Sequence, residues 1–495
     1  MAQHVLDDSA PAATEVQPRA RLQSRRVAQR RLGWALLAVF AAVFVVRVAP
    51  GLDDPFSYVP SGGGLPIDSY NDAVFSLGGR ALRDRGVVDS KLGAEWGAGD
   101  HYADHPPLVY SATAIAQTVT GDDELAARGL ALVASLAAMV LLFLLLIELG
   151  VPPPLAALSV GVALSVPMFI AYGTMLDTLM LGLPFAVAYL LLWQRSPDGR
   201  TRAWALGGVA AMTVLTAWEG ALLIGITLAM TLLLRRGRAA LGTIVAAGAG
   251  LVAGLAATAL WLVWANGGFG HLVDQGLQRA GGGAPLSLGE YLDRQLTWLR
   301  DLFGVPALIL LVGGVVAALV IPRFRAVAIA ALSTTLVYAG LFHQGSWQHD
   351  YWNYWLLITL TLAAGALAFI ASRAHRTFVT AALACLAIAV VVTGFTASTP
   401  VYLRTGGADL SPKLAATRRP VPGQRWVPVV QPNAERAGTS AVWTVPQERF
   451  NLGVPLRFAT PVRAAEFARR HPTFWLIVNY QVVRGDDALA LLAAS

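Results

Sequence analysis

The sequence predicts an all-α membrane protein that crosses the bilayer many times, with about eleven transmembrane helices. Of its 495 residues 56% are apolar and only 14% are charged, whereas a soluble globular protein carries roughly 25% charged residues. Long stretches such as Leu130–Ile147 and Leu241–Val263 contain no ionisable residue. Because hydrocarbon offers the backbone no hydrogen-bond partners, such stretches cross a membrane as helices, which satisfy their own backbone groups.

The amino-terminal segment, residues 1–32, is predicted to be a disordered cytoplasmic tail. It is polar and ends in four arginines at 25, 26, 30 and 31, directly before the first apolar run. This order indicates an uncleaved first span rather than a cleaved signal peptide. The single cysteine, Cys385, lies in an apolar stretch, so an intrachain disulfide or a multi-cysteine zinc site is excluded.

The membrane domain is expected over residues 33–395. A span needs about 20 predominantly apolar residues, which makes the short fifth segment the weakest of the set. The eleven predicted spans are Gly33–Val46, Leu125–Leu149, Leu155–Tyr172, Leu176–Trp193, Ala203–Thr216, Ala221–Leu234, Ala239–Ala265, Leu302–Ile321, Ala326–Phe342, Trp352–Ile370 and Phe378–Thr393.

The distribution of charge agrees with this count when the amino terminus is inside. The short connections 195–202, 235–238, 322–325 and 373–376 then lie inside, and each contains arginine. The first outer loop, over residues 51–105, has nine acidic and four basic residues. Inner loops of membrane proteins are enriched in basic residues. Membrane orientation therefore explains the net charge of +7 better than nucleic-acid binding does.

Two polar regions are predicted on the outer side of a cell membrane. The first is the long loop 51–120, whose weakly apolar end, Pro106–Thr120, is expected to be a helix at the interface. The second is residues 396–495, expected to form a small extracytoplasmic soluble α/β domain. Its predicted strands and helices, from strand-like runs and helical periodicity, are Arg425–Val430, Ala441–Val445, Val462–Arg470, Phe474–Asn479 and Asp486–Ala494.

Polar residues collect on this predicted outer side, which indicates a polar site there. They are Asp68, Asp72, His101, Asp104, His105, Asp177, the Trp218-Glu219-Gly220 hairpin, His271, Asp274, His343, His349 and Asp350. Five of the eight histidines are among them. The competing interpretation is that polar loop residues and interfacial aromatics need no function. Solvation alone, however, does not require the long loops to share one face.

The order of these residues resembles the GT-C type glycosyltransferases that use polyprenyl-phosphate sugars, such as protein O-mannosyltransferases and aminoarabinose transferases. The matching segments are Asp68-Ser69-Tyr70-Asn71-Asp72, His105-Pro106-Pro107-Leu108, Ala126-Ala127-Arg128, Gly173–Asp177 and His349–Tyr354. The resemblance covers about residues 33–372. It departs at Ser69, where the family has the second acid of an Asp-Glu pair. It also departs at Glu219, in a hairpin that often carries Lys-Gly in relatives.

The resemblance implies an integral membrane enzyme that moves a sugar from a polyprenyl-phosphate donor to an acceptor hydroxyl in a glycan, lipid or protein. A general base must then accept the proton of the attacking hydroxyl. By its match to the first acid of the family motif, Asp68 is the candidate for this role. The competing role for Asp68 is to cap the amino terminus of a helix over Ser69–Arg83.

The leaving phosphate gains negative charge, so nearby cations would stabilise it. Arg80 and Arg128 are the candidate phosphate ligands, although each could instead pair with a nearby acid, Asp84 or Glu124. The remaining candidates for donor or substrate binding are His105, Asp177, His349 and Tyr351. His105 could instead fix a rigid turn before its two prolines.

No cofactor is expected with certainty. A divalent metal held by His101, Asp104, His105, His343 or His349 is a weaker alternative, because the spacing lacks a strong zinc pattern. Two other classes of function stay open at this point. A transporter would show paired halves and broken helices, and a scaffold or sensor would act through residues 396–495.

Overall fold

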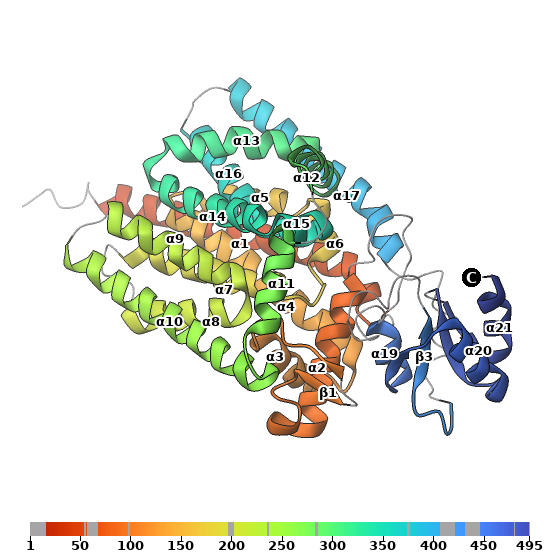
Figure 1. The fold of residues 1–495 in the computed structure, drawn as a ribbon. Coiled ribbons are helices and arrows are strands. Elements are labelled where there is room, and N and C mark those ends of the chain that lie inside the picture. The colour runs from red at the N-terminus through yellow and green to blue at the C-terminus, as the bar shows by residue number, and fades with distance from the viewer. Residues whose placement is uncertain are drawn as a thin grey trace, which may run out of the picture.

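Long apolar helices form the body of the protein, and a small α/β unit lies at one end (Figure 1). The computed structural model describes residues 16–53, 56, 68–97, 100–196, 202–234, 237–282, 286–373, 377–405, 421–430, 446–479 and 481–494. The first fifteen residues of the predicted tail, residues 1–32, and the predicted strand Ala441–Val445 lie outside the described residues. The rest of the tail, residues 16–32, is not disordered but forms the first part of a helix that continues into the first span.

The helices of the body follow the predicted spans closely. In chain order they are α1 Val16–Val48, α2 Asp68–Asp89, α3 Leu108–Thr120, α4 Asp123–Glu148, α5 Pro153–Ala163, α6 Pro167–Tyr172, α7 Thr178–Arg195, α8 Ala203–Thr216, α9 Trp218–Leu234, α10 Arg238–Asn266, α11 Gly270–Leu277, α12 Leu288–Phe303, α13 Val305–Val320, α14 Pro322–Leu341, α15 His343–Gln348, α16 Leu356–Ala371 and α17 Thr377–Thr405. Short helical turns lie at Ala49–Gly51, Gln278–Gly282 and Asp350–Asn353.

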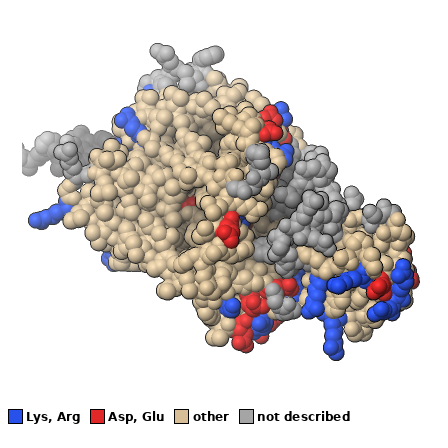
Figure 2. Space-filling model, viewed as in Figure 1, with Lys and Arg blue, Asp and Glu red and all other residues tan. Residues whose placement is uncertain are grey.

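The prediction of an all-α membrane protein with many spans is confirmed. Among the described residues, six helices are long and apolar enough to cross a membrane, or seven if the bent pair α12–α13 is one span. Four apolar helices of 10–17 residues accompany them. The count of eleven stays a prediction. Figure 2 shows a body whose surface is almost free of charged residues, as a lipid environment requires.

The predicted span Leu155–Tyr172 is not one continuous helix. The helix α5 ends at Ala163, and α6 begins only at Pro167. Proline lacks the backbone N–H that a continuing helix would need, but it fits the first turn of a new one. The break places Gly173 and the turn before α7 beside Ser135 of α4, whose hydroxyl donates to the Gly173 carbonyl at 2.6 Å.

Close helix packing relies on small residues. The helices α8 and α10 approach so closely that a Cβ on Gly250 would lie 2.2 Å from the carbonyl oxygen of Gly207. Likewise, a Cβ on Gly314 of α13 would collide with Ala363 of α16. Small residues let helix backbones approach where lipid provides no hydrophobic drive for association.

The first outer loop has its own structure. The predicted helix Ser69–Arg83 is extended to Asp89 in α2, with Gly86 at φ 78°. Two short strands follow, β1 Glu95–Gly97 and β2 Asp100–His101. The predicted interfacial helix is α3, which packs along α2 and buries Tyr110 against it.

The carboxyl-terminal unit is a four-stranded sheet with helices on both faces. Its elements are β3 Val427–Val430, α19 Pro446–Leu452, β4 Leu456–Phe458, α20 Pro461–Arg470, β5 Trp475–Val478, β6 Gln481–Arg484 and α21 Gly485–Ala494, with strand order β4-β3-β5-β6. Four of the five elements predicted for this region are therefore present within a residue or two. Leu452 of α19 packs on one face of the sheet, and α20 and α21 cover the other.

The helix α19 docks on α2 and joins this unit to the first outer loop. Arg449 donates to a carboxylate oxygen of Asp100 at 2.8 Å, and both side chains are buried. The ring of Phe450 packs on Phe56 at 4.7 Å, and the guanidinium of Arg80 lies 3.9 Å from the Phe450 ring centre. A buried pair that loses one partner leaves an uncompensated charge.

We expect Arg449→Gln to weaken the docking of α19 by about 3 kcal/mol, because Asp100 would stay buried without its cation. Hydrogen exchange of the amides of α19 measures this change. The matched control is Arg463→Gln on the exposed face of α20, which should shift local stability by less than about 0.5 kcal/mol. Equal exchange in the two variants would show that the Arg449–Asp100 pair does not hold α19.

Candidate active site

Asp72, a buried carboxylate in the first turns of α2, connects three elements. One of its oxygens accepts the backbone N–H of Leu176 at 2.6 Å, in the turn before α7. The other accepts the Nε of Arg128, on α4, at 3.3 Å. Asp72 is 1% exposed and Arg128 is 8% exposed. Since a buried carboxylate needs such partners, Asp72 fixes the start of α2 against α4 and α7.

Asp177 is the second carboxylate at this junction. It caps the amino terminus of α7 by accepting the backbone N–H of Leu179 at 2.8 Å. Its other oxygen accepts the Asn71 amide at 3.0 Å. Asn71 is also hydrogen-bonded to the buried phenol of Tyr351, which lies in the short turn before α16. Asn71 therefore links the two predicted site residues Asp177 and Tyr351.

Arg279 is the cation around which the polar residues gather. It lies in the helical turn Gln278–Gly282, partly buried, with its guanidinium 5.6 Å from the ring centre of Trp352. Its charge acts on side chains from six other segments of the chain. We define the Arg279 cluster as Arg279 with Tyr70, Tyr102, Asp104, His105, Asp177, Glu219, Tyr338, His349 and Tyr351.

The two histidines of the cluster are neutral imidazoles. His105 lies between Phe75 and Tyr102, with ring centres 5.6 and 5.8 Å away. His349 stacks on Trp352 at 5.7 Å. Burial, reinforced by the positive charge of Arg279, lowers the pKa of each to about 3. At neutral pH they can donate or accept a hydrogen bond, but they add no positive charge.

Asp104 anchors α11, the helix that precedes Arg279. The carboxylate is 1% exposed, and it lies 3.0 Å from the Nε2 of His271 and accepts a hydrogen bond from Gln275. No residue of α11 is buried, so these two contacts carry much of its attachment. The hydrogen bond to Asp104 raises the pKa of His271 above its usual value of 6.5.

The structure brings most of the predicted site residues together. His105, Asp177, His349 and Tyr351 are all in the Arg279 cluster. Asp68 is the first residue of α2, one helical turn before Asp72, and its side chain lies outside the described residues.

The two predicted phosphate ligands, Arg128 and Arg80, form ion pairs with acidic residues other than those named from the sequence. Arg128 pairs with Asp72 rather than with Glu124, and it also donates to the carbonyl of Gly51 at 2.8 Å. Arg80 pairs with Asp123 at 2.6 Å rather than with Asp84, and donates to the Phe450 carbonyl. A phosphate role for either stays a prediction.

Sequence reasoning missed Arg279 and Tyr338 and treated Glu219 as a departure from a motif. Glu219, in the first turn of α9, is 5% exposed and hydrogen-bonded to Tyr338 of α14. The segment Gln278–Gly282 has no recognisable motif. Its only signal is an arginine beside glycines in a long outer loop, which does not distinguish it from other loop arginines.

The residues considered for a metal do not form a common site. Among the described residues, no group of three or more His, Cys, Asp or Glu side chains could hold a metal ion. His101 is hydrogen-bonded to Asn266, and His343 packs edge-on against Tyr291 with ring centres 6.2 Å apart.

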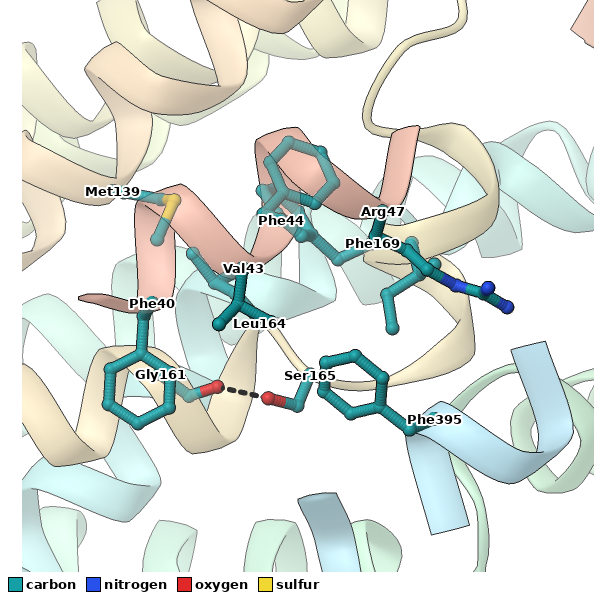
Figure 3. A pocket seen from close by; sticks show the side chains of 11 residues that line it. Phe40, Val43, Phe44, Arg47, Met139, Gly161, Leu164, Ser165, Phe169 and Phe395 are labelled. Atoms are coloured by element: carbon teal, nitrogen blue, oxygen red, sulfur yellow. Dashed lines mark hydrogen bonds between the residues drawn. The ribbon is translucent and has the colours of Figure 1, made fainter. Parts of the chain in front are cut away.

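A separate cavity lies between α1, α5, α6 and α17 (Figure 3). It is lined mainly by Phe40, Phe44, Leu164 and Phe169, with Arg47 at one side. Its volume of about 20 Å³ suffices for about one water molecule. It is therefore too small to hold a sugar or a lipid chain, and the Arg279 cluster is the better candidate site.

Comparisons with known proteins relate part of the chain to a sequence family and most of it to a known fold. Residues 104–264 match the sequence model of the dolichyl-phosphate-mannose-protein mannosyltransferase family. This segment begins at Asp104 of the cluster and includes Asp177 and Glu219. A search of curated proteins found no match.

Solved structures of glycosyltransferases have a similar fold. ArnT from Cupriavidus metallidurans, bound to undecaprenyl phosphate, has 17% identity and a TM-score of 0.57, with 86% of each chain covered. The oligosaccharyltransferase AglB from Archaeoglobus fulgidus, with a peptide and a dolichol-phosphate, has 12% identity and a TM-score of 0.51; 93% of this chain and 68% of that chain are covered. Arabinofuranosyltransferase AftD from Mycobacteria has 16% identity and a TM-score of 0.50, over 92% of this chain and 36% of that chain.

The chain is therefore a polytopic membrane protein with the GT-C glycosyltransferase fold. The resemblance inferred from its sequence motifs is confirmed at the level of the fold. Its fold is similar to that of ArnT over 86% of each chain.

We expect the attachment of α11 to depend on pH. The pKa of His271 is raised in the folded protein, so the Asp104 contact is fully present below about pH 6.5 and is lost as pH rises through the raised value. Hydrogen exchange of the α11 amides, corrected for intrinsic rates, should therefore show less protection at pH 9 than at pH 6. His271→Gln should remove this difference, and a difference that persists in the variant would assign it to another group.

Proposed function

We propose that this protein is an integral membrane glycosyltransferase that moves a sugar from a polyprenyl-phosphate donor to an acceptor hydroxyl. The acceptor would be a glycan, lipid or protein of the cell envelope, and the reaction would take place on the outer face of the cell membrane. The amino terminus would be cytoplasmic and residues 396–495 extracytoplasmic, as the arginine distribution predicts. No cofactor is required by this proposal.

The Arg279 cluster is the observation that carries the proposal. It places a partly buried cation beside carboxylates, neutral imidazoles and tyrosines, next to the amino terminus of α2, where Asp68 lies. Tyr70, two residues after Asp68, is already within the electrostatic range of Arg279. A phosphate and a sugar hydroxyl need these two kinds of partner, a cation and hydrogen-bonding groups, close together.

The proposed reaction is a single displacement at the anomeric carbon. The acceptor oxygen forms the new bond to this carbon while its proton passes to the carboxylate of Asp68. The bond between the anomeric carbon and the phosphate oxygen breaks, and the electron pair leaves with the polyprenyl phosphate. Arg279 stabilises the negative charge that grows on this phosphate. Inversion at the anomeric carbon is the expected stereochemical outcome.

Asp177, Tyr351, His105 and His349 would bind and orient the sugar and the phosphate. Asp177 is held by Asn71 and by the amino terminus of α7, so its position is well defined. A fixed carboxylate can accept hydrogen bonds from sugar hydroxyls. Arg128 would act through Asp72 by holding α2 in place. Arg80 would contribute through the same helix, which it fixes to Asp123.

Asp68→Asn should lower the transfer rate by at least about 100-fold, because the variant cannot accept the acceptor proton. Transfer from a radiolabelled polyprenyl-phosphate sugar in reconstituted membranes measures the change. Asp84→Asn, an exposed position on the same helix, is the matched control and should retain activity. An unchanged rate in Asp68→Asn would exclude Asp68 as the base.

Arg279→Gln should weaken donor binding and slow transfer, because the leaving phosphate would lose its cation. A loss of about 100-fold in kcat/KM is expected from removing one stabilising group of this kind. Arg279→Lys should recover part of the loss, since lysine keeps the charge but not the bidentate geometry. The control is Arg300→Gln on the exposed face of α12. Equal activity of Arg279→Gln and Arg300→Gln would show that Arg279 is not a donor ligand.

A further inference from the structure

Arginines and aromatic rings gather at one end of the carboxyl-terminal sheet. The strands β3 and β5 are parallel and β6 is antiparallel to β5, so the starts of β3 and β5 and the end of β6 lie at the same end of the sheet. The carboxyl end of α20 leads into β5 at this end. We define the arginine–aromatic face as Arg425, Trp426, Arg457, Phe467, Arg469, Arg470, His471 and Phe474.

The rings of this face form one continuous group. Trp426, which precedes β3, lies 5.0 Å from the ring of Phe467 on α20. His471 lies 4.9 Å from Phe467 and stacks on Phe474 at 4.7 Å, with an angle of 12° between the planes. His471 is exposed, and the other three are partly exposed. The group therefore forms a continuous, partly exposed aromatic surface.

One arginine contacts these rings, and three others are next to ring residues in the sequence or one residue away. Arg425, Arg457, Arg469 and Arg470 are exposed, and Arg457 lies 5.9 Å from the centre of the Trp426 ring. Arg470 is 4.0 Å from Glu466. Among the described residues, Arg425, Arg457 and Arg469 form no ion pair. On the face that Figure 2 shows, basic side chains are denser on this unit than on most of the body.

Acidic residues do not cancel this charge. The acidic residues of the two helices on this face of the sheet are Glu466 on α20 and Asp486 and Asp487 in the first turn of α21. At this position the positive end of the helix dipole stabilises their negative charges. With Arg484 at the end of β6, five arginines oppose these three carboxylates.

We propose that the arginine–aromatic face binds an anionic glycan, a polysaccharide that carries carboxylate or phosphate groups. Aromatic rings offer flat apolar surfaces on which the C–H faces of sugar rings can stack. Arginines form bidentate hydrogen bonds with carboxylates and phosphates. The combination of stacked rings with unpaired arginines fits a charged sugar polymer better than it fits a neutral one.

A lipid surface is the competing partner, and the arrangement favours the glycan. Docking on a membrane needs apolar side chains that protrude between the headgroups beside the basic ones. The most exposed large apolar side chain among the described residues of this unit is Val462, 69% exposed. It lies at the opposite end of α20 from His471. The rings of the arginine–aromatic face instead pack against one another.

The position of this unit would bring a bound glycan close to the proposed active site. The helix α19 fixes the unit to α2, whose first turns carry Asp68 and Asp72. A polymer held on the unit would have a raised effective concentration at the active site. This part of the inference rests on the proposed function, because it makes the polymer the acceptor. The binding itself does not depend on transfer.

The test is the binding of full-length protein, in nanodiscs of neutral lipid, to fluorescent polygalacturonate, with dextran of equal length as the neutral probe. The wild type should bind polygalacturonate and not dextran. Arg469→Gln with Arg470→Gln should weaken this binding by about fivefold, and His471→Ala should weaken it by removing one ring of the stacked group. The matched control, Arg300→Gln with Arg463→Gln, removes two exposed arginines elsewhere and should leave binding unchanged.

Three outcomes would overturn the proposal. They are no binding of polygalacturonate by the wild type, an equal loss in the two double variants, and stronger binding of the wild type to phosphatidylglycerol vesicles than to the glycan. Because the substituted residues are exposed, folding should persist, and unchanged thermal unfolding checks this. Donor hydrolysis, measured separately, tests the proposed function, so the failure of one proposal is distinguishable from the failure of the other.

Discussion

The arrangement of the candidate site depends on the burial of Asp72. A carboxylate at this depth is tolerated only when hydrogen bonds and a cation compensate for the lost water. Asp72 obtains both, from the backbone of Leu176 and from Arg128. This requirement brings the start of α2 against α4 and the turn before α7. Asn71 then reaches Asp177, and Asp68 lies one turn earlier on the same helix.

The same helix is fixed at its far side by the carboxyl-terminal unit. Arg80 of α2 contacts both Asp123 and Phe450, and Arg128 lies 5.2 Å from the centre of the Phe56 ring, which packs on Phe450. A continuous set of contacts therefore runs from α19 to the Asp72 junction. The carboxyl-terminal unit is therefore a structural part of the site. A change in how it docks would alter the position of the start of α2.

Much of the fold could be predicted because the membrane imposes a simple pattern. Apolar stretches without charges give the helices, and arginine clusters give the connections. The break between α5 and α6 was not predicted, because Leu164, Ser165 and Val166 are compatible with a helix. Only the position of Pro167 pointed to a boundary. For Arg80 and Arg128 the alternative to phosphate binding was a pair with Asp84 or Glu124, nearby in the sequence, whereas the fold supplies tertiary partners, Asp123 and Asp72.

The site was predicted where local motifs exist and missed where only tertiary structure creates it. His105 and Asp177 lie at helix boundaries next to proline or in a capping position, which are visible in sequence. Arg279 is 102 residues from Asp177 by number and lies in an irregular turn. Nothing in its neighbourhood marks it. It becomes distinctive only when the fold places its charge beside Asp104, Asp177 and Glu219.

The charge balance of the cluster bears on the kind of donor that it suits. Arg128 is compensated by Asp72 and Arg80 by Asp123, and His105 and His349 are neutral, so Arg279 supplies the positive charge that faces the site. The carboxylate of Asp177 would repel an anion with several charges. A sugar linked through a phosphodiester has one negative charge, which one guanidinium can match in bidentate geometry. A diphosphate has at least two, and the second charge would face the carboxylate of Asp177. The electrostatics therefore suit a polyprenyl-monophosphate sugar, whose phosphate needs full stabilisation only as the bond to the sugar breaks.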